Sequence, residues 1–186
     1  MGLTGNNSHS ADQLLAKIQD AWPDDDPLPE GQIFASFGPW GYGKASDYFV
    51  GRRLSQIDLR HPHIIELGTY NEAFTEEAKS YYAGVYLANM VRAYQGTPMW
   101  DGEGAVAHFL DYLLRKGHSL PFSPKQSSVI ADVLNFVADR IDLEFFWTEE
   151  EVDKLLKAIK YWRERSRPPS QLIVRTLDKK GSGFID

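Results

Sequence analysis

The sequence predicts a mainly helical protein, a single compact domain of five to seven helices with little or no sheet. Apolar residues recur at helical spacing over 11–22, 75–94, 102–115, 124–140 and 149–164. Three of these segments open with a capping box, in which a Ser or Thr is followed three residues later by Gln or Glu. Of the 186 residues 42% are apolar and 25% charged, as in a folded globular chain. We expect a helical domain over 10–167, a flexible N-terminus over 1–9 and a C-terminal tail over 168–186.

The first helix is expected to begin after Ser10, because Gln13 stands where it completes a capping box. Its apolar residues fall on one face: Leu14, Leu15, Ile18, Ala21 and Trp22. Pro23 and the acidic run Asp24–Asp26 end it. The segment 23–45 is rich in Pro and Gly, so we expect a long irregular loop that carries Phe37, Trp40 and Tyr42.

Short helical elements are expected next, before the longest helix. A helix over 46–54 would turn Tyr48, Phe49 and Leu54 inward, and 61–66 would form a further turn. The longest helix follows Thr75, a predicted N-cap, and Glu76 and Glu77 suit the positive end of the helix dipole. Its apolar face consists of Ala78, Tyr81, Tyr82, Val85, Tyr86 and Ala88.

Three more helices complete the predicted domain. The first, over 102–115, has its apolar stripe at Val106, Phe109, Leu110 and Leu113. The second opens with Ser123-Pro124-Lys125-Gln126, a capping box with Pro at the first helical position, and turns Val129, Ile130, Val133, Phe136 and Val137 to the core. The third opens with Thr148 and Glu151 and has the stripe Val152, Leu155, Leu156 and Ile159. Within the tail, 172–174 could pair as an edge strand.

Composition limits the classes of partner. The formal net charge of −6 disfavours nucleic acid, whose binding depends on Lys and Arg, and mildly favours a basic protein partner. There is no Cys, which excludes disulfides and thiolate metal sites. No run of about 18 apolar residues occurs, and residues 1–10 lack the apolar core of a signal peptide, so we expect no membrane contact and a cytoplasmic location.

Two motifs match known ligand sites only in part. Residues 38–44 fit the phosphate-loop pattern G-x-x-x-x-G-K, but Ala45 stands where a Ser or Thr must hold magnesium. Residues 178–186 resemble the first nine positions of a calcium loop, but Lys180 occupies a ligand position and the Glu of position twelve is missing. We therefore expect no cofactor and no metal, and a degenerate nucleotide binder through Lys44 remains an alternative.

A catalytic alternative rests on histidines and tyrosines. His61 and His63 have the spacing of paired imidazoles, but the sequence positions no third ligand for zinc. With Glu72 and the tyrosines of the long helix they could form the site of a small hydrolase or transferase. The tyrosine cluster, Tyr81, Tyr82, Tyr86 and Tyr94, is more typical of a core with hydroxyls at its rim.

Two stretches also carry a family resemblance. Residues 74–82 read F-T-E-E-A-K-S-Y-Y, and residues 122–126 read F-S-P-K-Q. Together with the first helix they resemble an uncharacterised bacterial helical family with an F-T-x-E-A-x-x-Y-Y helix and a later F-S-P-x-Q helix. The resemblance covers most of 11–140 but not the loop at 31–45 or the tail after Arg167. It implies a helical fold and a bacterial cytoplasmic setting, and it supplies no catalytic residues because the family is a domain of unknown function.

The functional hypothesis is a non-enzymatic protein-binding module, such as an acidic bacterial immunity or antitoxin-like protein that neutralises a basic toxin. Its expected contact residues are the acidic run and the aromatic residues of the following loop: Asp24, Asp25, Asp26, Phe37, Trp40 and Tyr42. Aromatic anchors dominate interface energy when they fill a pocket on the partner. The alternative is that these aromatic side chains pack back over the first helix and close the core.

Overall fold

A computed structural model describes residues 10–34, 47–58, 74–94, 111–114, 120–140 and 148–167. Its helices are α1 (Ala11–Ala21), α5 (Glu76–Ala93), α7 (Pro124–Ala138) and α8 (Glu149–Arg165), with two 3-10 helices, η1 (Glu30–Gln32) and η2 (Leu54–Gln56). Residues 47–49 and 111–114 are also helical. Within these ranges the only β-pairing is an antiparallel bridge between Phe34 and Phe74. The prediction of a mainly helical domain is confirmed.

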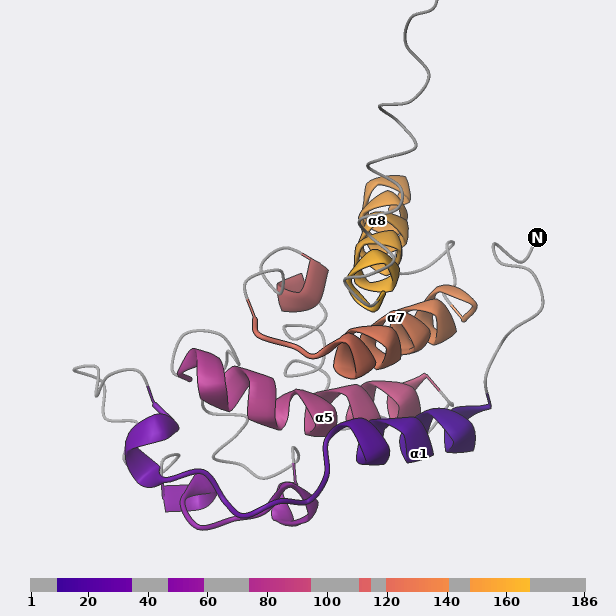
Figure 1. The fold of residues 1–186 in the computed structure, drawn as a ribbon. Coiled ribbons are helices and arrows are strands. Elements are labelled where there is room, and N and C mark those ends of the chain that lie inside the picture. The colour runs from indigo at the N-terminus through magenta and orange to yellow at the C-terminus, as the bar shows by residue number, and fades with distance from the viewer. Residues whose placement is uncertain are drawn as a thin grey trace, which may run out of the picture.

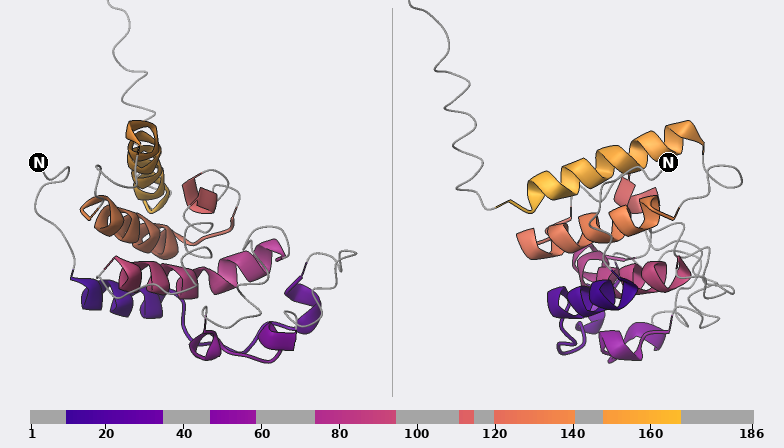
Figure 2. Two further views of the ribbon diagram at one scale, coloured as in Figure 1. Left: turned by 180° about the vertical axis from the view of Figure 1, so that it is seen from behind. Right: turned by 90° about the vertical axis from the view of Figure 1, so that its right-hand side faces the viewer.

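The helices form stacked layers, with α7 in the middle. In Figures 1 and 2, α8 lies over one side of α7, and α1 and α5 lie side by side on the other. Ten of the fifteen residues of α7 are buried, including the five predicted to face the core, because neighbours cover this helix on several sides. α1 and α5 run in opposite directions, and the end of α1 lies against the first half of α5 (Figure 1). Among the described helices, none combines the length and the hydropathy needed to cross a bilayer.

The helix starts follow the caps predicted from the sequence. Ser10, Ser123 and Thr148 each accept a hydrogen bond from the backbone N–H three residues on, and the side chain at that position bonds back to the cap. Thr75 accepts from the N–H of Ala78 at 3.0 Å. These bonds satisfy N–H groups that have no partner inside the helix, so a short sequence pattern determines where each helix begins.

The start of α5 is joined to the segment after α1. The Thr75 N–H donates to the carbonyl of Ile33 at 3.1 Å, and the Thr75 hydroxyl donates to the carbonyl of Gln32. Ile33 is completely buried, and Phe34 packs against the same core. The predicted irregular loop therefore needs a correction, because its first part holds η1 and the bridge to Phe74. Residues 35–46, with Phe37, Trp40 and Tyr42, lie outside the described residues.

An aromatic cluster joins segments that are far apart in the sequence. The ring centroid of Phe49 lies 5.1 Å from that of Phe74 and 5.0 Å from that of Tyr82. Phe34 lies 5.3 Å from Phe74. Ring pairs at such separations contribute about 0.5–1.5 kcal/mol beyond area burial. The cluster holds the segments around η1 and η2 against α5.

Two further predictions need correction. The predicted helix over 46–54 is in fact a helical turn over 47–49 and the separate η2, because the chain passes through Gly51 at a φ of +70°, where a helix ends. Its inward residues were correctly predicted, since Tyr48, Phe49 and Leu54 are buried. On α8, the helical periodicity predicts that Leu156 faces the core, but this residue is 37% exposed. The face of α8 that packs on α7 instead includes Ala158 and Trp162.

Candidate partner-binding surface

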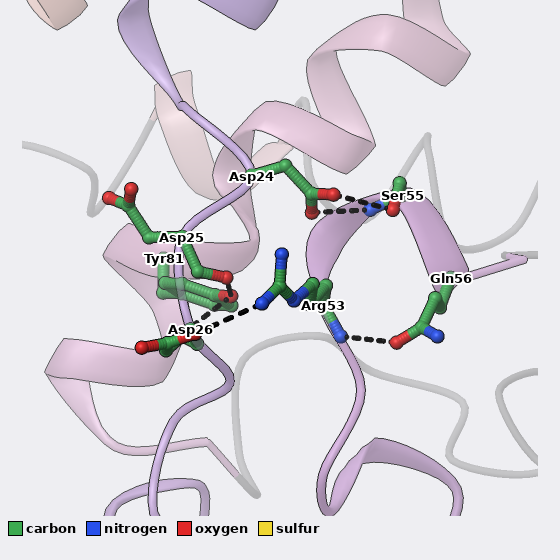
Figure 3. Close-up of polar contacts among 7 residues, drawn as sticks. All are labelled: Asp24, Asp25, Asp26, Arg53, Ser55, Gln56 and Tyr81. Atoms are coloured by element: carbon green, nitrogen blue, oxygen red, sulfur yellow. Dashed lines mark hydrogen bonds and ion pairs between the residues drawn. The ribbon is translucent and has the colours of Figure 1, made fainter.

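The acidic run after α1, which we call the acidic turn (Asp24–Asp26), is anchored to η2 through Asp24. The Asp24 carboxylate accepts hydrogen bonds from the hydroxyl of Ser55 at 2.7 Å and from its backbone N–H at 3.0 Å (Figure 3). These two donors, the hydroxyl first, hold the pKa of Asp24 below its usual value of 3.8. The side chain is therefore ionised at neutral pH and fixed in direction.

Asp26 and Tyr81 provide the other anchors of the turn. Arg53 Nη2 lies 3.1 Å from a carboxylate oxygen of Asp26, a pair that is too exposed to stabilise the fold by more than about 1 kcal/mol. The Tyr81 hydroxyl of α5 lies 3.4 Å and 3.3 Å from the backbone carbonyls of Asp25 and Asp26, to which it donates. Burial, and then the negative charge of Asp24, raises the pKa of Tyr81, which keeps this donor protonated.

Asp25 differs from its neighbours because its side chain is not engaged by the groups that hold the turn. Its backbone N–H donates to the carbonyl of Pro23 at 2.9 Å, while its carboxylate points away from Ser55 and Arg53 in Figure 3. Asp25 is exposed, so the turn presents at least one solvent-accessible carboxylate on an anchored backbone. Such a group is available to a cation on a partner.

A groove of about 420 Å³ lies next to the turn, between α1, η2 and α5; we call it the α1–α5 groove. Its walls combine apolar side chains with the polar Gln19 and Asn89; the apolar ones include Leu15, Ile18, Trp22, Ile57, Val85 and Ala88. Asp24 and Ser55 lie on its rim, so the bond that anchors the turn also belongs to the groove. A volume of this size is within the range of pockets that bind ligands.

The two ends of the groove differ in charge. Trp22 and Asp24 follow α1 at the end where Trp22 contacts Ser80 and Gly84. Because α1 and α5 are antiparallel, the other end lies near Leu15 of α1 and Arg92 of α5, both of which line the groove. Arg92 is exposed. The groove thus has an acidic end and an end with a cation.

Only some of the predicted site residues belong to the part of the chain that the structure describes. Asp24 lines the α1–α5 groove, and Asp25 and Asp26 follow it in the same turn, whereas Phe37, Trp40 and Tyr42 lie outside the described residues. So do the residues of the alternative sites: His61, His63, Glu72, 38–45 and 178–186. Of the tyrosine cluster, Tyr82 and Tyr86 are buried core residues, as predicted. In the described part of the chain no three His, Cys, Asp or Glu residues lie close enough to hold a metal ion.

Sequence reasoning missed a buried carboxylate on α7. Asp132 is 4% exposed and lies 2.7 Å from Lys17 Nζ of α1 and 2.7 Å from Arg163 Nη1 of α8. The signal available was a single acidic residue inside the apolar run 129–138. A buried carboxylate needs a compensating charge, so this residue predicts cationic neighbours without identifying them. The arrangement joins three helices and is structural.

Comparison of the chain with protein-family models, with curated protein sequences and with solved structures finds no match in any of the three. The resemblance to the family with the F-T-x-E-A-x-x-Y-Y helix therefore stays a prediction.

Proposed function

We propose that this protein is a non-enzymatic protein-binding module that recognises a basic partner through the acidic turn and the adjacent α1–α5 groove. The observation that carries the proposal is the anchoring of the turn. Ser55, Arg53 and Tyr81 hold the backbone of three successive acidic residues and two of their carboxylates beside a groove with apolar side chains in its walls. A charged surface that is already ordered loses less conformational entropy on binding than a flexible one.

Charge supports a basic partner. The net charge of −6 and the acids of the turn would speed encounter with a cationic protein and disfavour acidic ones. A bacterial cytoplasmic immunity or antitoxin-like protein that neutralises a basic toxin fits this role. We further propose that Phe37, Trp40 and Tyr42, which follow the turn in the sequence, supply aromatic anchors to the same interface.

Affinity capture with a matched pair of charge reversals tests the proposal. The wild-type protein and the variants Asp25→Lys and Glu164→Lys are each immobilised and incubated with lysate of the source organism. The proteins that each one retains are quantified by mass spectrometry. Both variants change the net charge equally, but Glu164 lies on α8, on the far side of the molecule from the turn (Figure 1). We expect Asp25→Lys alone to lose a basic protein that the wild type retains.

Kinetics with that captured protein provide the second readout. Its association rate with the wild type should fall as salt rises, and Asp25→Lys should lower both the rate and its salt dependence. Equal capture by the wild type and Asp25→Lys would contradict the proposal. So would equal loss with Glu164→Lys, which would show that only net charge matters.

A further inference from the structure

We infer that the α1–α5 groove binds a short amphipathic helix of the partner, with its basic end over the acidic turn and its opposite end beside Arg92. The inference rests on the proposed function, because it names the element of the partner that this surface recognises. It follows from three features of the groove: its length, its apolar walls and the different charges of its ends.

The length of the groove matches two turns of a helix. Leu15 and Trp22, which line it on α1, are seven residues apart, so this wall extends over about 10.5 Å at 1.5 Å per residue. In a docked helix, anchors at positions i and i+7 are the same distance apart, with a third anchor at i+3 or i+4 between them. An extended strand would cover that distance in about three residues and bring at most two side chains to the groove.

The walls of the groove present apolar surface on which apolar side chains of the partner helix can pack. Leu15 and Ala88 are only half-buried and pack against the edge of the core, so they leave apolar surface facing the groove. Beneath them Ile18, Trp22 and Val85 are buried and fixed. Covering this surface with the apolar face of a helix removes it from water, which is the main source of affinity in helix-in-groove recognition.

The charges at the two ends of the groove determine the direction in which the partner helix lies. Asp24 lies on the groove rim and Asp25 and Asp26 follow it, whereas Arg92 lines the opposite end. Lys or Arg side chains at one end of a helix would face the acids, and acidic side chains at its other end would face Arg92. The reversed placement brings like charges together at both ends, which disfavours that orientation.

Designed peptides test the inference directly, because they reproduce the chemistry of the proposed helix and do not require the partner itself. The probe is a fluorescein-labelled fourteen-residue helix, a length of about four turns, with leucines at i, i+3 and i+7, glutamates in its first turn and lysines in its last, the order that the helix dipole favours. One control peptide has the same composition with the charges evenly mixed, and another has the leucines replaced by serine. We expect anisotropy titrations to give the probe an affinity about ten times higher than that of either control, the effect of about 1.4 kcal/mol.

Matched protein variants locate the binding site. Ala16→Glu places an acidic side chain at the Arg92 end of the groove, where it opposes the glutamates of the probe, and Leu156→Glu places the same side chain on α8. We expect the first to weaken probe binding about tenfold, or about 1.4 kcal/mol, and the second to leave it unchanged. Circular dichroism confirms that both variants are folded.

The orientation of the bound probe is measured with a nitroxide label on its lysine end. Because the protein has no Cys, the label is unique to a cysteine added to the peptide. We expect the amide signals of Asp25 and Ser55 to be broadened more strongly than that of Arg92. Three results would each overturn the inference: no binding of the probe, probe binding that Ala16→Glu leaves unchanged, or equal broadening at both ends of the groove. The proposed function is decided separately, by whether Asp25→Lys loses the captured protein.

Discussion

Trp22 and Gly84 meet so closely that a β-carbon on residue 84 would lie 2.7 Å from Cβ and from Cγ of the tryptophan. The indole N–H of Trp22 also donates to the carbonyl of Ser80, one turn earlier on α5, at 2.9 Å. This contact fixes the end of α1 against α5. Because the acidic turn begins two residues after Trp22, the same contact positions the turn and one end of the groove.

Gly84→Ala should therefore destabilise the protein, although Ala favours helices over Gly by about 1 kcal/mol. The new methyl group would displace Trp22, and overpacking of this kind costs about 1–3 kcal/mol. Urea unfolding followed by circular dichroism measures the change. Gly31→Ala is the control, because nothing lies within 4 Å of the added carbon there. An increase in stability with Gly84→Ala would show that α1 and α5 can separate freely.

The bond between Asp24 and Ser55 should survive mild acid. The pKa of Asp24 is depressed in the folded protein, so the stabilisation is present above its unfolded value of about 3.8 and is lost as pH falls through the lower folded value. Carbon-13 chemical shifts of the Asp24 carboxyl should report a midpoint below 3.8. Ser55→Ala removes the stronger donor and should raise that midpoint, whereas Ser128→Ala, on α7, should not. An unchanged midpoint in Ser55→Ala would mean that the hydroxyl does not hold the turn.

The buried carboxylate of Asp132 should depend on its two cations. Lys17 and Arg163 are 41% and 44% exposed, so each can be hydrated when Asp132 is removed, but Asp132 itself is 4% exposed. Lys17→Met with Arg163→Met should leave an uncompensated buried charge and cost about 3–5 kcal/mol. Asp132→Asn should cost less, because no charge is then buried. Urea unfolding compares the two, and a larger loss for Asp132→Asn would contradict this account.

Local sequence signals are sufficient to predict the described long helices and much of the core. A cap such as Ser123 and a side chain three residues away determine a helix start without any tertiary information, which is why the predicted starts of α1, α5, α7 and α8 are confirmed. The predicted starts at 61 and 102 lie outside the described residues. Leu156 shows the limit of periodicity. Its stripe continues along α8, but α7 covers only part of that helix, and the width of the covered face is set by packing.

The surface around the acidic turn could not be predicted from local sequence signals. The sequence drew attention to Asp24–Asp26, but their anchors are remote: Ser55 is 31 residues from Asp24, and Tyr81 is 56 residues from Asp25. The groove requires the packing of α1, η2 and α5, and Lys17 is 115 residues from Asp132. No local pattern encodes such pairings, because each depends on how segments far apart in the chain come together.

Tyr82 and Tyr86 of α5 should resist ionisation in alkali. Burial, and then a neighbouring tyrosine, raises the pKa of Tyr82 and of Tyr86 well above the usual 10.0. Above pH 10 the unfolded chain loses these protons first, so stability that is complete below that pH falls as pH rises, by about 1.4 kcal/mol per pH unit for each tyrosine. Tyrosinate absorbance should show that at least two tyrosines ionise only when circular dichroism reports unfolding. In the described part of the chain the Tyr82 hydroxyl has no hydrogen-bond partner, so Tyr82→Phe should preserve stability at neutral pH and reduce the alkaline slope by about half. Ionisation of all nine tyrosines near pH 10 in a protein that is still folded would show that α5 does not bury this pair.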